Sequence, residues 1–141
     1  VVARTEALIQ GRGHYVALER ARMYTDAGCD AFLIHNKNKT PEEVLEFADR
    51  YHAAGLTTPL VCVPTTYNQV TTEQLGDAGF SLAIYANYSV RATVRVLQQM
   101  FGEIIEGGSL SSGNDHVEPM STIFDLIWVN ELVENQKRYG S

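Results

Sequence analysis

The stretch that decides the fold is VVARTEALIQGRG, residues 1–13. Its first three residues are apolar, as at the end of a buried strand, and Arg4, Thr5 and Glu6 follow directly. A loop with two glycines comes next and leads into a stretch of helical periodicity. In parallel α/β proteins, chemistry takes place at the carboxyl ends of the strands. The stretch therefore predicts a strand that delivers polar side chains to a site.

Three further apolar runs repeat this pattern along the chain. They are DAFLIH at 30–35, PLVCVP at 59–64 and FSLAIYAN at 80–87. Each run is continuously apolar rather than alternating, which is typical of strands that are buried on both faces of a parallel sheet. Together with residues 1–3, the sequence predicts four parallel strands.

The segments between these runs have the periodicity of helices. Residues 14–28 place apolar side chains at helical intervals and end at a glycine, the residue expected just past a helix. In residues 39–55, we expect Thr40 to be the N-cap, with Pro41 in the first turn. Glu43 lies three residues after Thr40 and is expected to complete a capping box with it.

A shorter helix is predicted around residues 71–79, and a long one over residues 89–106. The result is four consecutive βα units. Such units fit either a small doubly wound sheet or half of an eight-stranded (β/α)₈ barrel, and periodicity does not distinguish the two. The start of the chain within a strand favours the half-barrel, whose first and last strands, residues 1–3 and 80–87, would then lack outer partners.

The remaining sequence predicts a connector and one last helix. Residues 107–121 are rich in Gly and Ser and are predicted to form a flexible connector. In the helix predicted over residues 122–141, apolar side chains surround the axis, so one sheet cannot cover them. We therefore expect this helix to be buried against another subunit of a homo-oligomer. The side chains expected in that contact are Ile123, Ile127, Trp128 and Leu132.

Composition limits the classes of function. The 141 residues are 45% hydrophobic and 20% charged, enough for an ordinary core. The net charge of -6 argues against a nucleic-acid surface or a polybasic membrane contact. No apolar run approaches the ~18 to 20 residues of a spanning helix, and no signal peptide is recognisable, so we expect a cytoplasmic protein. Cys29 and Cys62 lack CxxC spacing and are interpreted as buried free thiols.

Four stretches together resemble a known family: VVARTEALIQGRG, AGCDAFLIHNK, PLVCVPTTY and AIYANYSVRA. In order and spacing they are similar to the carboxyl-terminal half of phosphoenolpyruvate mutases and phosphonopyruvate hydrolases, in the isocitrate lyase superfamily. The resemblance covers nearly the whole chain. It implies a half-barrel over residues 1–106, a connector over 107–121, and a last helix over 122–141 that is swapped between the subunits of a dimer or tetramer.

The resemblance also implies which residues form the site. Arg4 matches the arginine of the RTEA motif, which reaches the anionic substrate, and a planar guanidinium suits bidentate contact with a carboxylate or phosphonate. His35, at the end of FLIH, matches the active-site histidine, whose ring N–H would stabilise charge on substrate oxygens. Thr65 and Asn87 match positions at the ends of the last two strands, where they either contact substrate or hold loops together. Alone, each of these residues is more often structural, and the pairing of Arg4 with His35 favours a site.

The family chemistry moves a phosphoryl group between the enol oxygen and the methylene carbon of pyruvate, which interconverts phosphoenolpyruvate and phosphonopyruvate. In the resemblance, Mg²⁺ polarises the pyruvate oxygens, and its acidic ligands and the gating loop belong to the amino-terminal half. This sequence does not contain that half, so no metal ligand is expected in it. The isolated chain is expected to be inactive, and the segment that precedes Val1 would be decisive.

Two positions depart from the family pattern. Tyr88 stands where the mutases and hydrolases carry histidine, and Asn36 replaces a serine that commonly follows the histidine. A phosphonopyruvate hydrolase and a C–C lyase of the same superfamily therefore remain alternatives to a mutase. From another class, a non-catalytic α/β module that self-associates through its last helix also remains open.

Overall fold

The computed structural model describes residues 1–140, and its first part is a sheet of parallel strands. These strands are β1 (Val2–Thr5), β2 (Ala31–Ile34), β3 (Leu60–Cys62) and β4 (Phe80–Ala83). All four predicted strands are confirmed, although β4 ends well before Asn87. They lie in the sheet in the order of the sequence, β1-β2-β3-β4, and every pairing is parallel.

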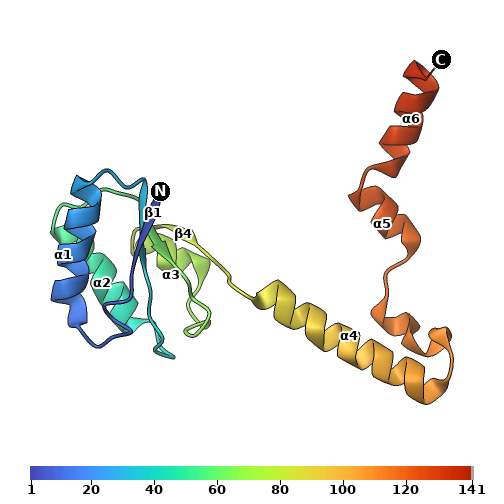
Figure 1. Cartoon of the computed structure of the whole chain (residues 1–141), viewed down its shortest axis with the longest axis horizontal. Helices are drawn as coiled ribbons and strands as arrows, with labels where there is room; N and C mark the ends of the chain where they lie inside the picture. Colours follow the sequence, from blue (N-terminus) through green and yellow to red (C-terminus); the bar gives the residue numbers. More distant parts are fainter. Residues whose placement is uncertain (141) are drawn as a thin grey trace. The chain divides into compact units, whose positions relative to one another are not determined.

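A helix follows each strand, as predicted. The helices are α1 (Gly13–Asp26), α2 (Glu42–Ala53), α3 (Thr72–Asp77) and α4 (Tyr88–Gly107). When each crossover is right-handed and each new strand is added at the same edge of the sheet, all the connecting helices lie on one face. In a doubly wound sheet, the strand order reverses partway, so helices cover both faces. Figure 1 shows α1 and α2 lying along the same side of the sheet. The sequential order excludes the doubly wound alternative and leaves β1 and β4 as edges within the described residues, as expected.

Aromatic rings form the core between the sheet and these helices. Phe32 of β2 lies against Phe47 and Tyr51 of α2, with ring centroids 6.1 and 6.0 Å away. All three side chains are fully buried, and so are Ala17 and Ala21 of α1. Small residues on α1 let its backbone approach the sheet, while the large rings of α2 fill the remaining space. This packing fixes the helices and hence the strand ends.

The start of α2 differs from the prediction. Thr40 is not its N-cap: the helix begins at Glu42, and Pro41 occupies the cap position without a side-chain capping hydrogen bond. Glu43, expected to complete the capping box, instead accepts a hydrogen bond from Asn38 Nδ2 at 2.7 Å. The capping box predicted at Thr40 is therefore wrong, because the helix begins one residue later than the box requires and the Thr40 side chain pairs with Glu42 instead.

A capping box forms at α3 instead. Thr71 Oγ1 accepts a hydrogen bond from the backbone N–H of Gln74 at 3.1 Å, and Gln74 Oε1 accepts one from the backbone N–H of Thr71 at 2.9 Å. Two backbone donors that the helix leaves unsatisfied are thereby paired.

We expect Thr71→Ala to lower the free energy of unfolding by about 1 kcal/mol, the usual cost of losing an N-cap. Denaturant unfolding followed by circular dichroism measures this difference. Thr57→Ala, at an exposed threonine outside the helices, is the matched control and should leave the midpoint unchanged. Equal midpoints for the two variants would show that the cap contributes nothing.

The contacts divide the chain into two compact units, Val1–Ser89 and a second unit from Val90 onward, and each is described by itself. This division groups most of α4 with the carboxyl-terminal helices. The half-barrel of residues 1–106 stays a prediction. The segment 107–121, expected to be a flexible connector, contains a 3₁₀ helix, η1 (Leu110–His116).

Two contacts hold η1 against α4. Gly113 is buried, and a Cβ at this position would meet the end of the Ile104 side chain at 2.9 Å, so a larger residue would displace that side chain. His116 Nε2 lies 2.9 Å from Glu103 Oε2. Hydrogen bonding to His116 helps to lower the pKa of Glu103 below its ordinary value. The Gly/Ser-rich segment 107–121 therefore contains a regular 3₁₀ helix that its composition does not indicate.

The end of the chain forms two helices where one was predicted over residues 122–141. They are α5 (Met120–Leu126) and α6 (Val129–Tyr139). Trp128 separates them with φ 60° and ψ 38°, a left-handed conformation that cannot continue a right-handed helix. No side chain of α4, α5 or α6 is buried. None of the described helices is long and apolar enough to cross a membrane.

Candidate active site

A hollow of about 420 Å³ opens at the carboxyl ends of the strands. Its lining includes apolar side chains from three strands or the residues that follow them: Leu33, Val63 and Ile84. It also includes every side chain that the sequence analysis assigned to the site: Arg4, His35, Thr65 and Asn87. Residues from four separate βα units therefore meet in one place.

The pleat of the strands explains this meeting. Arg4 of β1 pairs in register with Leu33 of β2, and His35 lies two residues further along the chain. Side chains alternate between the faces of a sheet, so these three share one face. Phe32 and Ile34 point to the other face, where they are fully buried in the core. The hollow is thus on the face of the sheet opposite the aromatic core.

Arg4, Glu6 and His35 form a charged cluster at this edge. Arg4 Nε donates a hydrogen bond to Glu6 Oε1 at 2.6 Å, and Arg4 Nη2 also pairs with that carboxylate. Arg4 Nη2 lies 2.7 Å from His35 Nδ1, and this nitrogen is 3.2 and 3.3 Å from the two carboxylate oxygens of Glu6. Because arginine can only donate, the short contact requires an unprotonated Nδ1, whereas a bond to Glu6 requires a proton on it.

The sequence analysis gave Glu6 no role. The signal was present, because Glu6 follows Arg4 by two residues, and that spacing places side chains on the same face of an extended chain. Burial acts to raise the pKa of Glu6, but hydrogen bonds from Arg4 and His35 outweigh it and hold the pKa below its ordinary value. The carboxylate is therefore ionised at neutral pH and balances the charge of Arg4.

The opposite side of the hollow is made by two loops that are tied together. Thr65, after β3, donates a hydrogen bond from Oγ1 to the carbonyl oxygen of Ala86 at 3.3 Å. Tyr88 Oη accepts one from Asn68 Nδ2 at 2.7 Å. Between these two ties, Asn87 has φ 66°, a left-handed conformation that residues other than glycine seldom adopt. The loops thus fix Asn87 in a conformation of raised energy beside the hollow.

Asn36, the second departure from the family pattern, supports the loop after β2. Its side chain is only 2% exposed, and its Oδ1 accepts a hydrogen bond from the backbone N–H of Asn38 at 2.8 Å. Its carbonyl oxygen accepts one from Thr66 Oγ1 at 3.5 Å. Asn36 does not line the hollow, so its visible role is to shape the loop that follows His35.

The described residues do not fit a magnesium site by themselves. No three His, Cys, Asp or Glu side chains come together in this part of the chain. Mg²⁺ requires octahedral oxygen ligands, usually with one or two carboxylates. The one carboxylate of the cluster, Glu6, is already paired with Arg4.

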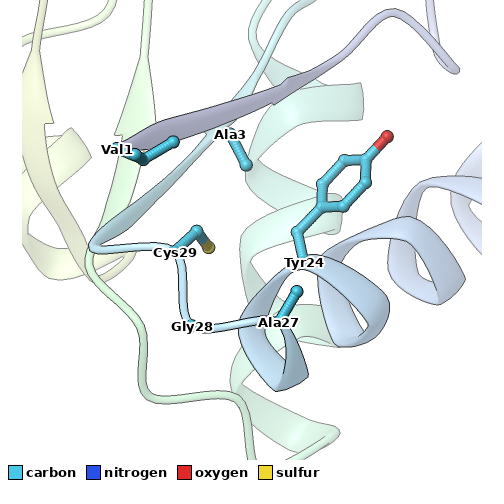
Figure 2. Close-up of a pocket in the computed structure, with 6 residues that line it drawn as sticks. All are labelled: Val1, Ala3, Tyr24, Ala27, Gly28 and Cys29. Carbon is cyan, nitrogen blue, oxygen red and sulfur yellow. The ribbon is translucent and has the colours of Figure 1, made fainter.

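A second hollow, of about 240 Å³, contains none of the predicted site residues (Figure 2). Its lining is largely apolar: Val1, Ala3, Tyr24, Ala27, Gly28 and Cys29. Both cysteines are free thiols as predicted, but only Cys62 is buried, whereas Cys29 is half-buried. Burial raises the pKa of the Cys62 thiol to about 11, so it stays protonated at neutral pH. Neither cysteine contributes chemistry to the first hollow.

Parallel βα units in sequential order, with polar side chains gathered at the carboxyl ends of the strands, are typical of the (β/α)₈-barrel class of enzymes. Comparison with known proteins identifies the family. The chain belongs to the phosphoenolpyruvate phosphomutase family, whose sequence model matches residues 1–105.

Individual relatives agree with this assignment. Phosphoenolpyruvate phosphomutase of Tetrahymena pyriformis is 37% identical over 139 residues, which cover 99% of this chain and 45% of that protein. The crystal structure of phosphoenolpyruvate phosphomutase from Streptomyces platensis subsp. rosaceus superposes with a TM-score of 0.90 at 42% identity, over 100% of this chain and 48% of that one. The crystal structure of phosphonopyruvate hydrolase in complex with oxalate and Mg²⁺ superposes with a TM-score of 0.88 at 33% identity, over 100% of this chain and 49% of that one. The chain therefore spans about half the length of the relatives it matches, and its βα units correspond to half of a barrel.

Proposed function

We propose that this chain is the carboxyl-terminal half of a phosphoenolpyruvate mutase-like enzyme, which interconverts phosphoenolpyruvate and phosphonopyruvate. The observation that carries the proposal is the convergence of Arg4, His35, Thr65 and Asn87 on one hollow at the strand ends. A substrate of this class carries a carboxylate and a phosphoryl group, and this hollow offers a guanidinium, an imidazole, a hydroxyl and an amide as donors. Family membership supports the same reaction class.

In this proposal each side chain has a distinct task. Arg4 binds an oxygen pair of the anionic substrate through its guanidinium. His35 donates a ring N–H to oxygens on which charge develops. Asn87 donates to the remaining oxygens, and Thr65 donates to them once its hydroxyl turns from the carbonyl oxygen of Ala86 toward the substrate. A loose phosphoryl-transfer transition state needs mainly such positioning and charge neutralisation.

We propose that the Mg²⁺ ligands lie outside this sequence. The relative with oxalate and Mg²⁺ supports the involvement of the ion in the family, whereas the described residues here do not form a ligand set. When bound, the ion would polarise the pyruvate oxygens of the substrate. The isolated chain is accordingly expected to be inactive, and the complete enzyme to act in the cytoplasm.

The fate of the phosphoryl group separates the mutase from its alternatives. With phosphonopyruvate as substrate, a mutase moves the group from carbon to the enol oxygen and yields phosphoenolpyruvate. A hydrolase transfers it to water and yields pyruvate and inorganic phosphate, and a C–C lyase does neither. Phosphorus NMR of the complete enzyme with phosphonopyruvate and Mg²⁺ distinguishes these outcomes. Phosphate as the main product would change the assignment from mutase to hydrolase. The hydrolase structure is about as similar to this chain as the mutase structure.

We expect the complete enzyme to be a dimer or tetramer that covers the apolar side chains of α5 and α6. In the single chain these side chains are 39% to 69% exposed: Ile123, Ile127, Trp128 and Leu132. Burying such surfaces between subunits removes apolar area from water. Sedimentation velocity at micromolar concentration measures the assembly.

Ile127→Lys is expected to weaken that assembly, and Asn130→Lys on the neighbouring helix is the control for added charge. A complete enzyme that sediments only as a monomer would contradict the swapped-helix arrangement. Self-association without turnover of phosphonopyruvate, or of the 2-methylisocitrate named for the lyase relatives, would instead favour the non-catalytic module.

A further inference from the structure

We propose that Glu6 is a positioning residue, which holds the guanidinium of Arg4 through Nε and Nη2 and so presents Nη1 to an anion in the hollow. Glu6 Oε1 accepts from Arg4 Nε at 2.6 Å and also pairs with Nη2. Nη2 also lies 2.7 Å from His35 Nδ1, so these contacts leave Nη1 as the donor that can turn to an anion. Among the described residues, Nη1 has no hydrogen bond or ion pair. The inference rests on the proposed function only in taking the anion to be a substrate group.

Arg4 needs a residue that fixes its side-chain conformation, because about half of its side chain is exposed. A long, exposed arginine samples many rotamers, and fixing them at the moment of binding costs free energy. A residue that fixes the guanidinium beforehand removes that cost from the binding step.

Glu6 is itself well fixed by the turn after β1. Thr5 Oγ1, which is buried, accepts hydrogen bonds from the backbone N–H of Ala7 at 3.3 Å and from Arg20 Nη1 at 3.2 Å. The Thr5 hydroxyl thus closes the turn through Ala7 and joins it to α1 through Arg20. The backbone on either side of Glu6 is therefore held in place, so its carboxylate starts from a fixed point when it pairs with Arg4 and His35.

The opposite interpretation is that Glu6 merely neutralises Arg4. The two interpretations predict opposite changes in anion affinity when Glu6 is removed. A negative charge beside an anion site weakens anion binding by Coulomb repulsion, so its removal should tighten binding if charge balance were its only contribution. Removal of a positioning residue should weaken binding, in spite of the lost repulsion.

The test measures the affinity of the complete enzyme for inorganic phosphate by NMR titration. We expect Glu6→Ala to bind phosphate roughly three- to tenfold more weakly, which corresponds to the cost of immobilising one long side chain on binding. Glu6→Gln keeps an amide oxygen that can accept from Arg4 Nε, so its affinity should stay at or above that of the unmodified enzyme. Unchanged or tighter binding by Glu6→Ala would overturn the proposal.

A second measurement needs no ligand. Solvent exchange of the Arg4 Nε–H, observed in ¹⁵N-labelled enzyme, should be slow in the unmodified enzyme, intermediate in Glu6→Gln and severalfold faster in Glu6→Ala. Glu19→Ala removes an equal charge from the exposed pair with Arg22 and should leave the Arg4 signal unchanged. Equal exchange rates at Arg4 with and without Glu6 would overturn the positioning role, even if phosphate did not bind and the proposed function failed.

Discussion

Arg4→Lys is expected to lower kcat/KM for phosphonopyruvate in the complete enzyme by roughly 30- to 900-fold, equivalent to about 2 to 4 kcal/mol of transition-state stabilisation. Lysine keeps the positive charge but loses the planar set of donors. It therefore cannot pair with Glu6 through one nitrogen and with the substrate through another. Steady-state kinetics with phosphonopyruvate, under conditions where Mg²⁺ is saturating, measures the loss.

The control for this substitution is Arg22→Lys. Arg22 also pairs with a glutamate, Glu19, but on the surface of α1 rather than at the hollow. Its replacement should leave turnover unchanged, which shows that the loss at Arg4 is not a general effect of replacing arginine. Full activity of the Arg4→Lys enzyme would remove Arg4 from the site.

His35→Ala is expected to cause a similar loss of turnover with little loss of stability. The histidine follows the end of β2, and its side-chain partners are Arg4 and Glu6 rather than the aromatic core. Removing it takes away a donor to the substrate but leaves the packing of Phe32 intact. Turnover and denaturant unfolding should therefore be measured on the same preparation.

His52→Ala is the matched control for this second substitution, because His52 lies on the exposed side of α2. We expect this variant to keep its turnover. If His35→Ala instead lost stability and activity in proportion, the role of His35 would be structural.

The sequence contains enough to locate the candidate site, because parallel strands share one edge. Once four continuous apolar runs are identified, the polar residues that follow them must gather at that edge. This is why Arg4, His35, Thr65 and Asn87 meet although they come from different units. Their chemical roles stay predictions, since a shared hollow does not show what enters it.

Local features that depend on competition between neighbours were not predictable in the same way. The pattern of Thr40 and Glu43 meets the requirements of a capping box, but the Thr40 side chain pairs with Glu42 and the helix begins after Pro41. The same pattern at Thr71, with Gln74 three residues later, does form the box. The break at Trp128 has no glycine or proline to announce it, so helical periodicity alone continues through it.

The sequential order of the strands also has a consequence for how the chain folds. Val2 pairs with Ala31 and Leu60 pairs with Phe80, so each strand finds its partner one helix further along the chain. A single helix is about the shortest crossover that parallel pairing allows, so this order keeps the loop-closure entropy of each pairing low. During synthesis, each new βα unit can therefore dock on the unit that emerged from the ribosome just before it.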